Sequence, residues 1–132
     1  MVRVSQPQIV RTLGKPVDGS GSFVCAWSAV GGCVVVKVAG TVDAGSAPEF
    51  AEQLRRVITT KSSTVVVDVR RVRELGVEGV GVLAAAEALA REHGGWLRVA
   101  GGQPWLGDLL APHAIPTYGE LPHALPSYRP AP

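Results

Sequence analysis

Hydrophobic and polar residues alternate along this chain with two different periods, which predict strands and helices. Four short segments rich in Val, Ala and Leu have the composition of strands. Gly31 and Gly32 separate the first two segments and predict a hairpin, in which Cys25 and Cys33 would lie near each other. The nearly unbroken valine run of the third segment is typical of a central parallel strand that is covered on both faces. The predicted strands span residues 23–29, 33–41, 64–69 and 96–100, with a further extended piece that ends at Tyr118.

Apolar residues at the three- and four-residue spacing of a helix fill the intervals between these strands. Residues 46–49 (SAPE) have the form of a capping box, so we expect Ser46 to cap the first helix and Glu49 to reach back to it. Gly94 and Gly95 are expected to end the second helix. The predicted helices begin after Ser46 and span residues 77–93 and 104–110, with a possible closing turn at residues 121–125.

The predicted order of elements is β-β-α-β-α-β-α, which is typical of an α/β fold. We expect a single domain in which helices pack on a mixed sheet of four to five strands, because 132 residues suffice for only one good hydrophobic core. Pro and Gly interrupt the pattern near both ends of the chain. The expected organisation is a flexible N-terminal arm over residues 1–21, the domain over residues 22–126, and a loose C-terminal tail over residues 127–132.

Composition argues against several classes of protein, namely disordered, nucleic-acid-binding and membrane-spanning proteins. A hydrophobic fraction of 46% and a charged fraction of 18% favour a folded core over disorder. The net charge of +2 argues against a nucleic-acid partner, and the densest basic run is interpreted as a solvated loop rather than a phosphate-binding patch. No segment resembles a membrane span or a secretory signal, so we expect a cytoplasmic protein. The basic run consists of Arg70, Arg71 and Arg73, with Glu74 beside it.

The motifs of common enzymes are absent from the sequence. It contains no phosphate-binding loop, and Gly76, Gly79 and Gly81 lack the spacing of a dinucleotide fingerprint. No serine has the context of a catalytic nucleophile, and the two cysteines, expected as free thiols, lack the histidines of a zinc site. We therefore expect no enzymatic activity, no cofactor and no metal. The three histidines, which we expect at the surface, are His93, His113 and His123.

Asp43 and Glu78 are carboxylates that should fall on loops at one end of the sheet. They could form a catalytic pair, but no metal-binding set or substrate cleft accompanies them. Asp43 is also typical of a turn residue whose side chain binds nearby backbone N–H groups. Glu78 would be favoured in the first turn of a helix by about 0.3–1 kcal/mol, because the helix dipole attracts negative charge there.

The second predicted helix has an apolar start on the face opposite its main stripe. The stripe expected to face the sheet comprises Gly79, Val82, Leu83, Ala86, Leu89 and Ala90. The opposite face begins with small apolar residues and becomes charged in its second half. An exposed apolar patch of this kind suits a partner interface, although a neighbouring loop could also cover it. The predicted partner-binding residues are Asp43, Gly76, Val77, Glu78, Gly79, Val80 and Ala84.

Four segments, in this order and spacing, are similar to one known family. Residues 40–50 (GTVDAGSAPEF) resemble the segment that leads into its first helix, and residues 66–69 (VVDV) resemble the strand before its switch loop. Residues 79–83 (GVGVL) are similar to the helix start after that loop, and residues 115–121 (IPTYGEL) to its last strand and turn. The chain from about residue 33 to residue 125 thus resembles the STAS domain of bacterial anti-sigma-factor antagonists.

The resemblance implies a regulatory protein that binds an anti-sigma factor, which is also a serine kinase, through the switch loop and the start of the second helix. In the family, that kinase phosphorylates a serine in a motif close to Asp-Ser-Ser-Gly, and the complex then dissociates. The corresponding positions here are Gly76, Val77, Glu78 and Gly79. Glu78 stands at the acceptor position, offers no hydroxyl, and carries one negative charge where a phosphoserine carries nearly two.

Three hypotheses follow from this departure. The chain could be an antagonist that binds its anti-sigma factor without the phosphorylation switch. Glu78 could instead mimic the phosphorylated state, so that the protein is a locked regulator with a different partner. The domain could also have been repurposed as a sensor that binds a nucleotide or a lipid. We favour binding of a regulatory protein over binding of a small ligand.

Overall fold

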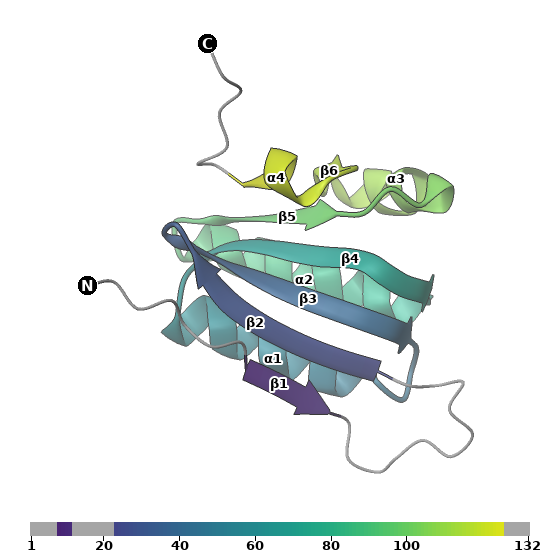
Figure 1. Ribbon diagram of the computed structural model, residues 1–132, viewed down its shortest axis with the longest axis horizontal. Helices are drawn as coiled ribbons and strands as arrows, with labels where there is room; N and C mark the ends of the chain where they lie inside the picture. Colours follow the sequence, from purple (N-terminus) through teal and green to yellow (C-terminus); the bar gives the residue numbers. More distant parts are fainter. Residues whose placement is uncertain (1–7, 12–22, 126–132) are drawn as a thin grey trace.

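The computed structural model describes residues 8–11 and 23–125, which form a mixed sheet and the helices packed on it (Figure 1). The sheet has the strand order β1-β2-β3-β4-β5-β6. The first three strands pair antiparallel, and β3 to β6 pair parallel. The elements are β1 (Gln8–Arg11), β2 (Phe23–Val30), β3 (Cys33–Val42), α1 (Ala47–Thr60), β4 (Thr64–Leu75), α2 (Val77–Glu92), β5 (Trp96–Ala100), α3 (Pro104–Leu110), a 3₁₀ turn (Ala111–His113), β6 (Thr117–Tyr118) and α4 (Leu121–Ala124).

This architecture confirms the predicted α/β fold with its mixed sheet. The predicted bounds of β5 and α3 are those of the structure, and the extended piece expected at Tyr118 is β6. One strand was not predicted, because Gln8–Arg11 pairs antiparallel with β2 inside the segment expected to be a flexible arm. Four residues give too short a pattern for a strand to be recognised, and this one forms by pairing with β2. The remainder of the predicted arm and the predicted tail lie outside the described residues.

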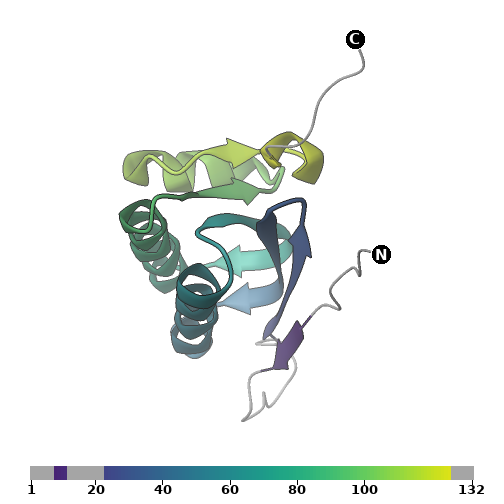
Figure 2. The same ribbon diagram turned by 90° about the vertical axis from the view of Figure 1, so that its left-hand side faces the viewer.

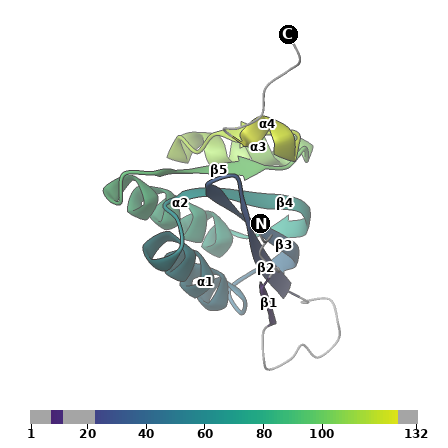
Figure 3. The ribbon, with the colours of Figure 1, turned by 60° about the vertical axis from the view of Figure 1, so that its left-hand side comes forward.

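Helices α1 and α2 lie side by side on one face of the sheet, whereas α4 lies against the other face beside β6 (Figures 2 and 3). The valines of β3 and β4 explain this arrangement, because successive side chains of a strand point to opposite faces. Val34, Val36 and their neighbours in alternation point into the core under α1 and α2. Val35 and Val66 point the other way and pack with Ala124 of α4. Both faces of β4 are therefore covered over residues 65–69, as the valine run there predicted.

The two cysteines are free and buried, but they do not lie near each other as expected. Cys25 stands opposite Val38 of β3, and Cys33 stands opposite Val30 of β2. The partner of Cys25 therefore lies five positions beyond Cys33 along β3. That separation corresponds to about 17 Å along an antiparallel strand. The two-residue turn at Gly31 and Gly32, both with positive φ, fixes this register.

Strand β4 continues six residues beyond the predicted end at Val69. Its inward residues are two apart up to Val69 and then three apart, at Val72 and Leu75, which pack in or against the core. Each longer interval leaves two successive exposed residues, at positions 70–71 and 73–74. The register with β3 slips at the same two places, which identifies two β-bulges. The basic run is therefore exposed to solvent, as expected, but it is not a loop, since the arginines belong to β4.

Candidate partner-binding site

Asp43 shapes the turn that connects β3 to α1. Its Oδ1 accepts hydrogen bonds from the backbone N–H groups of Gly45, at 3.0 Å, and Ser46, at 3.1 Å. The Ser46 hydroxyl donates to the Thr41 carbonyl oxygen and accepts from the Asp43 N–H, both at 3.0 Å. Ser46 is the N-terminal flanking residue of α1, as predicted, but its hydroxyl is engaged in the turn and makes no side-chain cap, so the predicted capping box is wrong. The interpretation of Asp43 as a turn residue is confirmed.

The turn at Asp43 lies directly beside the start of α2. The Gly76 N–H donates to the Val42 carbonyl oxygen at 2.8 Å, which holds the ends of the parallel strands β3 and β4 together. A Cβ placed on Gly76 would lie 2.9 Å from Glu78 Oε1 and 3.9 Å from Asp43 Cα. Asp43 and Glu78 thus lie on either side of Gly76 at one end of the sheet, as expected, but Glu78 belongs to the first turn of α2 and not to a loop. Figure 1 shows the tips of β3 and β4 at this edge.

The first two residues of α2 are the most accessible part of the site. Val77, the first residue of α2, is 79% exposed, an unusual environment for a valine. Glu78 is also exposed, and its carboxylate turns back toward Gly76, the N-terminal flanking residue, which offers no side-chain cap. A carboxylate in this first turn is compatible with the positive end of the helix dipole.

Of the residues predicted to bind a partner, two are buried and a third is half-buried. Val80 is only 5% exposed and belongs to the hydrophobic core. Gly79 is buried so closely that an added Cβ would lie 2.5 Å from Leu75 Cδ1. Ala84 is half-buried and packs against the core. The predicted surface face of α2 is wrong at Val80, although Val77 is exposed, because the helix packs against both the sheet and α1, which buries a wider arc than one stripe.

Two apolar side chains of α3 enlarge the site in a way that the sequence analysis missed. Trp105 is 37% and Leu109 is 36% exposed, one helical turn apart, while Leu106 and Leu110 fill the core. The two pairs, each at four-residue spacing, could have indicated an exposed apolar pair from the sequence, since a seven-residue helix on a surface can bury only one of them. Trp105 and Leu109 line a hollow of about 470 Å³. The other lining residues are Thr41, Val42, Asp43, Arg73, Glu74, Leu75 and Gly76.

Exposed apolar side chains therefore gather at one edge of the domain. In the part of the chain that the structure describes, four large hydrophobic side chains are exposed, and three of them are Val77, Trp105 and Leu109. Trp105 and Leu109 border the hollow, and Val77 follows directly on Gly76 in its wall. We define the rim site as Asp43, Gly76, Val77, Glu78, Trp105 and Leu109. A large aromatic residue beside a hollow is a typical anchor of protein interfaces.

Metal-ligating and nucleophilic side chains were the remaining candidates for chemistry. Within residues 8–11 and 23–125, no three His, Cys, Asp or Glu side chains gather where they could hold a metal ion. Burial raises the pKa of the Cys25 thiol to about 12, which disfavours the reactive thiolate. His93, His113 and His123 are exposed, as expected. Among the same residues, no helix has the length and apolar character needed to cross a membrane.

Comparisons with known proteins show a matching family and several solved structures of similar fold. The family described as "Mlab, STAS domain" matches residues 25–113 of the chain. The sequence has no match among the curated proteins. An anti-sigma factor antagonist from Mycobacterium paratuberculosis has a similar solved structure, with a TM-score of 0.74 at 24% identity, and the match covers 86% of this chain and 100% of that one.

The Bacillus cell fate determinant SpoIIAA has the same fold in two solved states. Its unphosphorylated form matches with a TM-score of 0.64 at 13% identity, over 75% of this chain and 91% of that one. Its phosphorylated form matches with a TM-score of 0.56 at 16% identity, over 73% of this chain and 92% of that one. At these identities the likeness concerns the fold.

Proposed function

Since this chain belongs to the STAS domain family, we propose that it binds an anti-sigma factor through the rim site, without serine phosphorylation at the start of α2. The observation that carries the proposal is the exposure of Trp105 and Leu109 in the wall of one hollow, with the exposed Val77 next in the chain to Gly76 of the same wall. Binding would remove this apolar surface from water, which is the main driving force of most protein association. The partner class comes from the solved relatives, which are anti-sigma factor antagonists.

Polar groups of the rim site would orient the partner. The Asp43 Oδ2 atom takes no part in the turn that Oδ1 holds, and Glu78 stands exposed beside it. Arg73 and Glu74, both exposed, line the same hollow. Charged groups at the border of an interface influence association rate and specificity more than affinity, whereas buried apolar anchors dominate the binding energy. We therefore assign the affinity to Val77 and Trp105.

The absence of a phosphorylation switch rests on the chemistry of Glu78. A carboxylate has no hydroxyl that could accept a phosphoryl group. Ser46, the serine at the adjoining turn, is buried and its hydroxyl is engaged with the backbone of Thr41 and Asp43. Neither residue can replace a serine at the start of α2. The complex would therefore persist in the presence of ATP, and its regulation would have to act elsewhere.

A capture experiment tests the proposal. The immobilised chain is incubated with a lysate of the source bacterium, and bound proteins are identified by mass spectrometry. We expect an anti-sigma factor with the sequence of a serine kinase to be retained by the wild type and to be lost with Val77→Asp and with Trp105→Ala. The control Arg56→Gln makes the same change in net charge as Val77→Asp on the exposed side of α1, and it should retain the partner.

Phosphoryl transfer separates the switch-free antagonist from the locked regulator. With the captured kinase and radiolabelled ATP, we expect no label on the wild type and label on Glu78→Ser. If Glu78→Ser binds the anti-sigma factor while the wild type does not, Glu78 acts as a permanent mimic of phosphoserine. If a nucleotide or lipid raises the melting temperature of the wild type and no protein is captured, the domain is a ligand sensor instead.

A further inference from the structure

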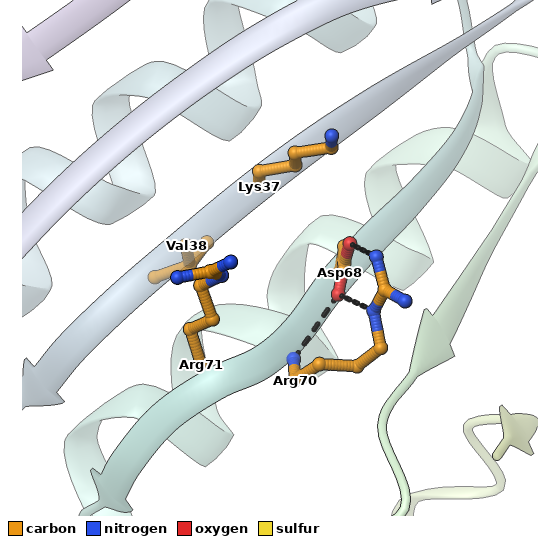
Figure 4. A pocket seen from close by; sticks show the side chains of 5 residues that line it. All are labelled: Lys37, Val38, Asp68, Arg70 and Arg71. Carbon is orange, nitrogen blue, oxygen red and sulfur yellow. Dashed lines mark hydrogen bonds and ion pairs between the residues drawn. The ribbon is translucent and has the colours of Figure 1, made fainter. Parts of the chain in front are cut away.

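A second hollow lies on the face of the sheet opposite α1 and α2, at the first bulge of β4 (Figure 4). Its volume is about 240 Å³, and it shares no lining residue with the hollow of the rim site. The bulge creates it, because two successive residues, Arg70 and Arg71, are exposed there instead of alternating between the faces. Lys37 of β3, which stands opposite Asp68 in the register, supplies a third cation.

Asp68 holds Arg70 in place and neutralises it. The Asp68 side chain is buried, with 4% of the residue exposed, and it accepts hydrogen bonds from Arg70 Nε at 2.9 Å and Arg70 Nη2 at 2.7 Å. The backbone N–H of Arg70 donates to the same carboxylate at 3.1 Å. These hydrogen bonds raise the pKa of Arg70, which stays charged, and they leave its Nη1 outside the pair. A buried carboxylate thus fixes one guanidinium at the wall of the hollow.

The other two cations keep their charge uncompensated. Within residues 8–11 and 23–125, neither Lys37 nor Arg71 has an ion-pair partner. Figure 4 shows the two on neighbouring strands, with the Asp68–Arg70 pair to one side. Three cations and one carboxylate give the hollow a net positive charge of two. Cations that line one recess without ion-pair partners raise the local concentration of anions.

We propose that this basic pocket, formed by Lys37, Asp68, Arg70 and Arg71, binds the phosphate group of a small soluble phosphate ester. A phosphate monoester carries nearly two negative charges and three strong acceptor oxygens, which suits the charge of the pocket and donors arriving from several directions. An ammonium on one strand and guanidinium groups on the next combine the two usual phosphate-binding side chains. The volume is below the roughly 300–1,000 Å³ of sites for drug-sized ligands, which favours a small ester as the ligand.

One further carboxylate acts on the pocket from outside. Glu120, between β6 and α4, lies near enough to raise the pKa of Arg70, although hydrogen bonding to Asp68 is the larger cause. Its own contact is with His123, at 3.8 Å, and the carboxylate side chain is mostly exposed. Removing this negative charge leaves the donors of the pocket intact. Glu120→Gln should therefore strengthen phosphate binding.

Titration calorimetry tests the proposal with two soluble probes, inorganic phosphate and glycerol phosphate, at neutral pH and low salt. We expect saturable binding of both by the wild type. Lys37→Gln and Arg71→Gln should each weaken binding by at least about tenfold, the effect of losing one charge-assisted hydrogen bond. Both side chains are exposed, so the variants should keep the melting temperature of the wild type. Arg56→Gln, which removes one positive charge on α1, should bind as the wild type does.

Several results would overturn the proposal. One is the absence of saturable binding of either probe to the wild type. Another is equal weakening of probe binding by Arg56→Gln and by Lys37→Gln, which would indicate a non-specific effect of net charge. A parallel binding measurement with lipid vesicles distinguishes a soluble phosphate ester from a lipid headgroup. Binding only to vesicles that contain phosphatidic acid, with no binding of glycerol phosphate, would assign the cations to a membrane surface and not to a soluble ester.

Discussion

Two glycines near the start of α2 have opposite surroundings. A Cβ on Gly79 would lie 2.5 Å from Leu75 Cδ1 and 2.7 Å from Val42 Cγ1, whereas a Cβ on Gly81 meets nothing within 4 Å. We expect Gly79→Ala to destabilise the protein by about 1–3 kcal/mol through overpacking. Gly81→Ala should stabilise it by about 0.5–1 kcal/mol, because Ala is favoured over Gly inside a helix. Denaturant unfolding measures both, and equal stabilities would mean that α2 does not approach the sheet so closely.

Val80 provides a second test at the scale of one residue. Its side chain lies in the core, so Val80→Asp buries a charge without a partner and should cost at least about 3 kcal/mol or prevent folding. Val77→Asp, three residues earlier on the exposed start of the same helix, should change stability by no more than about 0.5 kcal/mol. Thermal unfolding followed by circular dichroism compares the two. A stable Val80→Asp would restore the original assignment of this face to the surface.

These residues also show where local sequence is informative. The turn at Asp43 could be predicted, because the chemistry that forms it lies within four residues. The orientation of Val80 could not, since α2 is built largely of Val, Ala, Leu and Gly and its polar residues do not mark one face. Which arc of such a helix is buried depends on α1, which no short segment of α2 specifies.

At the scale of elements, most of the features that could not be predicted from the sequence lie in β4. Its first half alternates as a strand should, but its bulges shift the inward residues to a spacing of three at Val72 and Leu75. The side chain of Gln103 bridges the first bulge, because its Nε2 donates to the carbonyl oxygens of Val69, at 2.7 Å, and Val72, at 3.0 Å. A residue that begins α3 thus fixes the geometry of a strand more than thirty positions earlier, a contact that no local pattern contains.

Replacing Gln103 tests this bridge. Gln103→Glu keeps the size of the side chain but removes the donor, and it places a carboxylate against two buried carbonyl oxygens. We expect a loss of stability of about 1–3 kcal/mol from the unpaired groups, measured by denaturant unfolding. Hydrogen exchange should also increase along residues 69–72, where the bulge would loosen. Unchanged stability and exchange would show that the bulge is held by β4 and its neighbours alone.

At the scale of the whole molecule, most of the fold could be predicted because each long element carries its own periodicity. Strands β2 to β5 and helices α1 to α3 all have apolar patterns that extend over five residues or more. The parts of the fold that could not be predicted depend on contacts between elements. Pairing with β2 forms the short strand Gln8–Arg11, and the docking of α3 decides that Trp105 is exposed while Leu106 is buried. The predicted partner-binding residues stay a prediction, and the structure shows that two of them, Gly79 and Val80, are buried and that Ala84 is half-buried.

The buried thiols give the whole fold a dependence on alkaline pH. Burial raises the pKa of Cys25 from 9.0 to about 12, so the folded state keeps the proton that the unfolded state releases. Stability from this group is fully present below pH 9.0 and should decline as the pH rises toward about 12. Unfolding free energies measured across this range should fall less steeply for Cys25→Ala than for the wild type. Equal slopes would mean that the thiol is accessible to water in the native protein.

Binding of the captured anti-sigma factor to defined variants tests the central claim most directly. Calorimetry gives the dissociation constant for the wild type, for Val77→Asp and for the charge-matched control Arg56→Gln, each with and without ATP. We expect at least about a tenfold weaker complex for Val77→Asp, as for the loss of an interface anchor, the wild-type constant for Arg56→Gln, and no loss of the wild-type complex with ATP. Wild-type affinity of Val77→Asp, or dissociation of the wild-type complex by ATP, would contradict the account.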